Sequence, residues 1–296
     1  MAARQLQPRY MHFGKSRRGR QYPLHRTRLD STFRNWEKAH ADKQSEVRQY
    51  YQALYHAWGA QHWWPAETPF EVIVGAYLTQ NTAWTNVERA LANLRAARVL
   101  SVEGIRRLRQ RRLERLIRPS GYFRQKARRL KTFVAFLDKE YGGSLDRLFS
   151  QTTEKLRAEL LSLNGVGPET ADSILLYAGN HPVFVVDAYT RRILARHEIL
   201  PEKTDHEEIR QWMQSALAPL SHEQKTQQNP ATQIESGIRG ASHSPSAMST
   251  AARTLRVQVY NEMHGLLVGV GKHYCGKSQP QCDGCPLQPF LPRGTP

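Results

Sequence analysis

An aspartate at the start of a predicted helix is the first residue placed for chemistry. Asp187 follows the apolar run 183–186 and precedes a helical pattern over 188–196. A carboxylate at a helix N-terminus is stabilised by the helix dipole, even where it is partly buried. The same position is typical of a plain N-cap, whose carboxylate only accepts a backbone hydrogen bond. Position alone therefore makes Asp187 a stabilised carboxylate, whose simplest role is that of an N-cap.

The segment Leu-Asn-Gly-Val-Gly-Pro at 163–168 predicts a turn between two helices that can bind an anion. Gly165 and Gly167, on either side of Val166, let the backbone come close to another surface. Pro168 is favoured at the first position of the next helix. The amides of the turn and of that helix then face outward, which suits a DNA phosphate. A helical hairpin without a ligand is the alternative interpretation.

Two tryptophans and three cysteines complete the residues that could do chemistry. Trp63 and Trp64 precede Pro65, and core packing is the simplest interpretation of either indole taken alone. The three cysteines all lie between 275 and 285, which excludes a small fold held together by disulfides.

The charge of the chain indicates a polyanionic partner. Lys and Arg number 43 against 26 Asp and Glu, which gives a net charge of +17. Most of this excess lies in segment 89–131, which holds fifteen basic and two acidic residues. Nucleic acid is the first candidate partner. An anionic membrane surface is the second, but the segment lacks the apolar aromatic face of an interfacial helix.

Apolar periodicity predicts an all-α fold, so helices must hold these residues in place. Apolar residues recur with helical spacing from 46 to 58, from 70 to 78 and in most later segments. Only 183–186 has strong β character, and it is too short to imply a sheet. Residues 1–45 are predicted to be a basic disordered arm. Residues 221–252, rich in Ser, Gln, Thr and His, are predicted to be a disordered insertion.

The distribution of apolar residues speaks against a membrane protein. No apolar run approaches the roughly 18 residues that a membrane helix needs. The N-terminal charges are not followed by the apolar stretch of a secretory signal. We therefore expect a cytoplasmic protein that associates with the nucleoid. We also expect it to be a monomer.

Several motifs in order resemble the endonuclease III superfamily of helix-hairpin-helix DNA glycosylases. Segment 163–172 is similar to its hairpin, 185–189 to its aspartate motif and 70–82 to its early helix. Segments 118–127 and 260–265 also fit. The subgroup with the strongest resemblance is that of the endonuclease III-like 3-methyladenine DNA glycosylases, which share the Trp-Trp-Pro element.

The resemblance covers residues 46–290 apart from the insertion. It implies two helical domains with a cleft between them. The bundle that carries the helix-hairpin-helix would span 67–186. The second domain would combine 46–66 with 187–290 and hold the three cysteines near its end.

The resemblance implies a catalytic role for Asp187 and a distinctive one for Glu169. The matching aspartate of the superfamily faces the sugar of the flipped nucleotide, where its charge can stabilise an oxocarbenium-like transition state or orient water. Bifunctional members carry a lysine at the position of Glu169, and its amine attacks the sugar to form a Schiff base. A carboxylate cannot do so. We therefore expect hydrolysis by water that leaves an abasic site.

The resemblance also implies that the partner is double-stranded DNA containing damaged bases, and it implies where the base and the DNA are bound. Trp63, Trp64 and Pro65 would form a base pocket, because electron-rich rings hold an electron-poor alkylated purine by stacking and cation–π attraction. Gln80 and Asn81 end the early helix. One of these two is expected to fill the gap that the flipped base leaves.

The cysteines match the first three ligands of the superfamily's iron–sulfur motif. Cys275, Cys282 and Cys285 have its spacing, but Leu291 stands where the fourth cysteine is due. A 4Fe–4S cluster normally takes four thiolates. Either a non-cysteine ligand completes the set, or the site is a relic of one.

The sequence thus predicts a monofunctional base-excision-repair DNA glycosylase for damaged purines, in particular alkylated ones. An endonuclease III-type enzyme that acts on oxidised pyrimidines or mismatches and has lyase activity is the alternative within the same class. A catalytically idle DNA-binding module is the alternative from another class, and Asp187 speaks against it.

Overall fold

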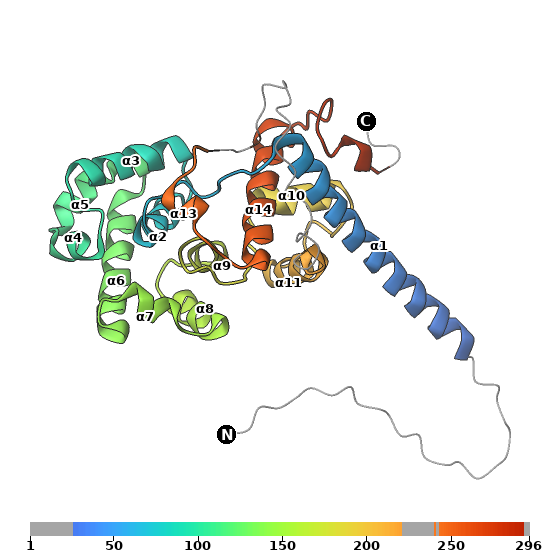
Figure 1. Ribbon diagram of the computed structural model, residues 1–296, viewed down its shortest axis with the longest axis horizontal. Helices are drawn as coiled ribbons and strands as arrows, with labels where there is room; N and C mark the ends of the chain where they lie inside the picture. Colours follow the sequence, from blue (N-terminus) through green and yellow to red (C-terminus); the bar gives the residue numbers. More distant parts are fainter. Residues whose placement is uncertain (1–25, 221–239, 241–242, 293–296) are drawn as a thin grey trace, which may run out of the picture. The chain divides into compact units, whose positions relative to one another are not determined.

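The computed structural model describes residues 26–220, 240 and 243–292, with side chains from residue 41 onward. Every regular element in this part of the chain is helical, which confirms the predicted all-α class (Figure 1). None of the described helices combines the length and the apolar character needed to cross a membrane. Asp42–Pro296 forms one compact unit, so the division into two domains with a cleft stays a prediction.

The first helix is longer than the sequence predicts. α1 spans Arg26–Trp58, so the predicted disordered arm is wrong for residues 26–45, and residues 1–25 lie outside the described residues. Residues 36–45 include Glu, Lys, Ala and Gln, which favour a helix by intrinsic propensity. They form no apolar stripe, and for this reason hydrophobic periodicity does not detect them.

The helices before the hairpin pack around α2 and α6. Thr68 caps α2, and the helix is buried from Phe70 to Leu78 because it is apolar on nearly every side. α2 contacts α3 and α6, and α4, α5 and α7 contact α6; the group lies on the left of Figure 1. The elements are α2 (Pro69–Leu78), α3 (Trp84–Ala96), α4 (Val102–Arg107), α5 (Gln110–Leu116), η1 (Arg118–Ser120), α6 (Phe123–Tyr141), α7 (Leu145–Phe149) and α8 (Thr153–Ser162).

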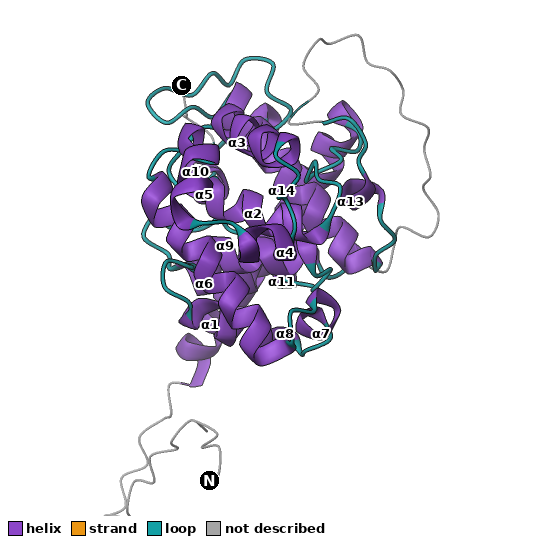
Figure 2. Cartoon of the chain, turned by 90° about the vertical axis from the view of Figure 1, so that its left-hand side faces the viewer, coloured by secondary structure: helices purple, strands orange, loops and turns teal. Residues whose placement is uncertain are grey.

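The later helices pack around α14, which is buried from Val259 to Gly271. The π-helical segment η2 contacts both α2 and α14 and so joins the two groups. The buried residues 183–186 are extended but form no sheet, and Figure 2 shows helices and loops alone in the described part. The elements are α9 (Pro168–Ser173), η2 (Ile174–Ala178), α10 (Ala188–Arg196), α11 (His206–Leu217), α13 (Ala247–Thr250), α14 (Leu255–His273) and η4 (Gln288–Phe290).

The end of the predicted insertion is ordered. His243 donates its backbone N–H to the carbonyl of Gln61 at 3.1 Å, and Met248 donates to that of Ala66 at 3.0 Å. Met248 is buried and lies in α13. The prediction of disorder is therefore wrong for 243–252, because the extended segment before α2 supplies hydrogen-bond partners that the local composition does not reveal. Residues 221–239, 241 and 242 lie outside the described residues.

Candidate active site and nucleic-acid interface

Asp187 begins α10 and uses only one carboxylate oxygen to do so. The residue is buried and is the N-cap of the helix. Its Oδ1 accepts a hydrogen bond from the backbone N–H of Thr190 at 2.7 Å. Its Oδ2 lies 3.6 Å from Nε2 of His264. The N-cap interpretation is confirmed, and because capping leaves the second oxygen available, the catalytic role of Asp187 stays a prediction.

The carboxyl group of Asp187 favours its charged form although it is buried. Burial by itself raises the pKa of Asp187, but the neighbouring imidazole of His264 and the N–H of Thr190 outweigh it and hold this pKa below its ordinary value. A charge in a buried site is weakly screened by solvent. It can therefore act strongly on positive charge that develops beside it.

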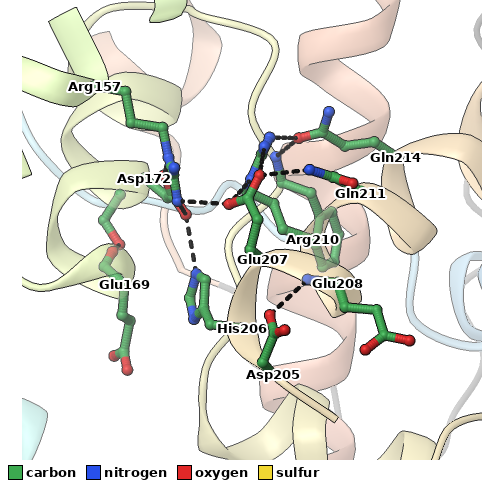
Figure 3. Close-up of polar contacts among 12 residues, drawn as sticks. Arg157, Glu169, Asp172, Asp205, His206, Glu207, Glu208, Arg210, Gln211 and Gln214 are labelled. Atoms are coloured by element: carbon green, nitrogen blue, oxygen red, sulfur yellow. Dashed lines mark hydrogen bonds and ion pairs between the residues drawn. The ribbon is translucent and has the colours of Figure 1, made fainter. Parts of the chain in front are cut away.

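Glu169 approaches the same site from the hairpin. It follows Pro168 in the first turn of α9, and its side chain is exposed. Although the side chain is exposed, the surrounding protein displaces water from its carboxyl group. This desolvation, and then the negative charge of Asp187, raise the pKa of Glu169. Figure 3 shows its side chain extending away from the ion-pair network of Asp172. The two predicted catalytic carboxyl groups are thus close enough to interact.

The two tryptophans lie beside the residues that face Asp187. The Trp63 ring is 5.9 Å from the ring of His264, and the Trp64 ring is 5.3 Å from that of Tyr177. Both indoles are buried, whereas Pro65 is half-buried. The tryptophans are core residues; His264 lies between Trp63 and the candidate catalytic aspartate, whereas Tyr177 and His264 both lie between it and Trp64.

The surroundings of Trp63 include two further basic side chains. The His243 ring lies 5.2 Å from the Trp63 ring, and the ammonium of Lys272 lies 5.5 Å from its centroid. Trp63 is only 7% exposed. A base could stack on this indole only if one of these covering groups moved. The stacking role of the Trp-Trp-Pro element stays a prediction.

Gln80 and Asn81 are placed differently. Gln80 donates through Nε2 to the carbonyl of Gly165 and to the hydroxyl of Thr170, both at 3.0 Å, and accepts from Arg129 at 2.6 Å. Asn81 is exposed and has a left-handed backbone, with φ of +52°. Gln80 therefore fastens the early helix to the hairpin, and Asn81 is the one that faces solvent.

The hairpin has the backbone that its glycines predict. Gly165 has φ of +82°, and a Cβ there would lie 1.8 Å from Nε of Arg129. A Cβ on Gly167 would meet nothing within 4 Å, so the surface is open at this point. No side chain caps the first amides of α9. These amides are therefore available to an anionic ligand.

Sequence reasoning missed an exposed aromatic residue. Tyr122 is 70% exposed and stands directly before α6 with φ of +44°. Aromatic residues usually indicate core, and Tyr122 gives no sign to the contrary apart from its neighbour Gly121 in a turn. Buried Lys126 donates to the carbonyls of Leu78, at 2.8 Å, and Ser120, at 2.6 Å. It thereby joins the turn before Tyr122 to the end of α2.

The three cysteines do not match the ligand set of an iron–sulfur cluster. Cys275 and Cys285 are buried, and Arg196 donates to Sγ of Cys275 at 3.2 Å. Burial, together with Cys282 and Cys275, raises the pKa of Cys285 to about 11. Leu291 occupies the fourth position. Within the described ranges no group of three or more His, Cys, Asp or Glu side chains is arranged to hold a metal ion.

Comparison with known sequences agrees with this site. A family model described as HhH-GPD superfamily base excision DNA repair protein matches residues 74–219. A protein of Methanocaldococcus jannaschii, named as a candidate DNA repair glycosylase, is 39% identical over 81% of this chain and 93% of its own length. The endonuclease III-like protein 1 of Mus musculus is 27% identical over 77% of this chain and 62% of its own length.

Two solved structures have a similar fold. The H. pylori 3-methyladenine DNA glycosylase bound to 1,N6-ethenoadenine is 26% identical, with a TM-score of 0.58 over 79% of this chain and 97% of its own. An endonuclease III trapped in a covalent intermediate with DNA is 19% identical, with a TM-score of 0.60 over 84% and 95%. The site and these likenesses agree: the chain belongs to the HhH-GPD superfamily of base excision DNA repair proteins and is a DNA N-glycosylase.

Proposed function

We propose that the protein hydrolyses the N-glycosidic bond of damaged purines, alkylated ones in particular, and leaves the DNA strand intact. The observation that carries this proposal is the buried carboxylate Asp187 beside a hairpin in which Glu169 stands where an amine would be needed for lyase chemistry. The similarity to a 3-methyladenine DNA glycosylase solved with ethenoadenine supports a purine substrate.

The reaction needs few groups. When the glycosidic bond breaks, its electron pair leaves with the base and positive charge develops on the sugar. The negative charge of Asp187 stabilises that sugar. Water then adds its oxygen to the anomeric carbon and loses a proton, which the departing base takes if it leaves as an anion and solvent takes if a cationic alkylated base leaves neutral. Asp187 is the group that can orient this water.

The DNA would be held by groups on three neighbouring turns. The open amides at Gly167 suit a phosphate. Asn81 is the residue suited to enter the gap left by the flipped base, because Gln80 is already bonded to the hairpin. Tyr122 offers an exposed ring on which a base can stack.

A base-release assay tests the substrate class. Duplexes that carry 3-methyladenine, 1,N6-ethenoadenine, uracil or an oxidised pyrimidine are incubated with enzyme, and the free base is measured. We expect release of the damaged purines. Because the Lys272 ammonium and the His243 ring cover Trp63, either base has to displace one of them, and a cationic base is also repelled by the ammonium if Lys272 stays. Release of pyrimidines alone would overturn the purine proposal.

We expect no strand cleavage and no covalent adduct after base removal. Borohydride traps an enzyme only through an imine, and Glu169 cannot form one. Abasic product should therefore stay intact until alkali is added, and trapping should be absent. The Glu169→Lys variant is the positive control for trapping, since it places an amine on the hairpin. Robust trapping of the unmodified protein would favour the bifunctional alternative, and Lys272 would be the first amine to replace.

The basic segment gives a prediction about salt. Arg106 and Arg107 form ion pairs within the protein, with Glu103 and Asp138, so the exposed Arg111 and Arg112 are the better candidates for phosphate contact. Reversing both to Glu should weaken binding to every duplex about equally and reduce the slope of log K against log salt.

The matched control for this prediction reverses the charge of two exposed lysines elsewhere in the chain, Lys203 and Lys277. It changes the net charge by the same amount at a different place, so it separates contact from overall charge. An unchanged salt slope in the arginine variant would mean that α5 does not touch phosphate.

The cysteine arrangement gives a prediction about iron. With Leu291 at the fourth position, the purified protein should be colourless and contain neither iron nor sulfide in stoichiometric amount. The Leu291→Cys variant restores the four-cysteine pattern and is expected to take up iron when made under the same conditions. Brown, iron-containing protein from the unmodified sequence would show that another ligand completes the set.

A further inference from the structure

A buried histidine lies between the candidate catalytic aspartate and a buried tyrosine. His264 is in the middle of α14 and is 4% exposed. Its Nδ1 is 2.6 Å from the hydroxyl of Tyr177. Its Nε2 is 3.6 Å from Oδ2 of Asp187 and has no hydrogen-bond partner within the described residues. Burying a polar nitrogen without a hydrogen-bond partner costs free energy of folding, so its presence here needs an explanation.

The contacts decide which nitrogen of His264 carries hydrogen. A lone pair on Nε2 would face the negative Oδ2 of Asp187 and be repelled, so Nε2 carries the hydrogen. In the neutral ring Nδ1 is then an acceptor. Burial, and then the charge of Asp187, raise the pKa of Tyr177 well above its ordinary range, so its hydroxyl keeps the proton that it donates to Nδ1.

We propose that His264, oriented by Tyr177, is a positioning residue that holds Oδ2 of Asp187 toward the sugar and keeps this carboxylate ionised. The proposal rests on the glycosylase function proposed above and adds two residues to it. The distance of 3.6 Å is longer than a hydrogen bond, and catalytic hydrogen bonds of free enzymes often shorten only when substrate is bound.

The same two side chains contact the predicted base pocket. The ring of Trp63 meets that of His264 at an interplanar angle of 67°, and that of Trp64 meets Tyr177 at 40°. A base that displaces His243 or Lys272 from the Trp63 ring would therefore push on His264, the residue that orients Asp187. The arrangement connects base binding with the placement of the carboxylate by direct packing.

Other charged groups also act on this set and must stay constant in any test. Arg253 and Glu262 act on Tyr177. Glu169 interacts with Asp187 and His264, and Arg191 and His206 act on Glu169. None of them is changed in the variants below.

The test is the pH dependence of single-turnover base release. Removing His264 removes an interaction that lowers the pKa of Asp187 and leaves the burial that raises it. His264→Leu should therefore move the acid limb of the profile to higher pH, with release about 10-fold slower per pH unit of displacement at a pH on that limb. His264→Gln keeps a donor near the position of Nε2 and should restore most of the profile. Tyr177→Phe should shift the limb in the same direction.

The matched control is His181, a second buried histidine whose Nδ1 is 3.0 Å from the hydroxyl of Thr153. His181→Leu should leave the acid limb unchanged. If His264→Leu does not fold, Tyr177→Phe and His264→Gln carry the test. Equal acid limbs in the unmodified protein and in every folded variant would overturn the proposal.

A second readout separates this proposal from the proposed function. In protein labelled with 13C at the aspartate carboxyl carbons, Asp187 is assigned by its loss in Asp187→Asn and titrated without DNA. The carboxyl should titrate at higher pH in the His264 and Tyr177 variants. This result can be obtained even if the protein releases none of the bases offered, and an unchanged titration would overturn the positioning role alone.

Discussion

Base release by the Asp187→Asn variant should be slower than that of the unmodified protein by about 10²–10³-fold. Asparagine has nearly the same size and still accepts the capping hydrogen bond from Thr190, so the helix start is retained. The negative charge that stabilises the developing cation is lost, and such preorganised electrostatic interactions are worth about 3–4 kcal/mol. The measurement is single-turnover release of the damaged base, with duplex binding measured in parallel and expected to persist.

The control is Asp205→Asn, which makes the same change at the N-cap of α11. Asp205 accepts from the N–H of Glu208 at 2.9 Å in the same way, but it is exposed. The two variants thus separate the loss of charge at the candidate site from a change of helix cap. Near-normal release by Asp187→Asn would remove this residue from the mechanism.

The second large effect is expected on stability and concerns Asp172. Its side chain is fully buried, accepts from Nε of Arg157 at 2.6 Å and lies 3.0 Å from Nε2 of His206 (Figure 3). Neutralising Asp172 removes the buried charge that Arg157 and His206 both face. It leaves Arg157 with only its half-exposed second partner, Glu207, at 3.2 Å. Asp172→Asn should therefore lower the free energy of unfolding by about 3 kcal/mol. Urea unfolding with an unchanged m-value would measure this loss.

Asp138 provides the comparison for Asp172. It also pairs with an arginine, Arg106, at 2.9 Å, but both side chains are about a third exposed. Ion pairs at the surface contribute little because water screens them. Asp138→Asn should leave the unfolding midpoint almost unchanged. An equal loss in both variants would mean that burial of Asp172 adds nothing to its pairing.

Local patterns were enough to predict the start of α10 and the hairpin. Asp187 follows a buried apolar run, and Gly165 adopts the positive φ that only glycine takes easily, so neighbouring residues decide both structures. The helix over 26–45 has no such pattern. Residues 36–45 include good helix formers, but the segment has no apolar stripe, and the prediction there was wrong.

Contacts between distant segments could not be predicted in this way. Tyr177 and His264 are 87 positions apart in the chain and meet because η2 packs against α14. The order of 243–252 likewise depends on hydrogen bonds to Gln61 and Ala66. A single sequence records periodicity within elements, whereas these contacts depend on how the elements are packed.

The buried ammonium of Lys126 has a consequence for how tightly the protein can hold DNA. It bonds at once to the end of α2, two residues before Gln80, and to the turn that leads to Tyr122. The tips that carry Asn81 and Tyr122 are thereby fixed relative to each other before any ligand arrives. Their conformational entropy is lost when the chain folds and not when it binds, so more of the contact energy remains as affinity.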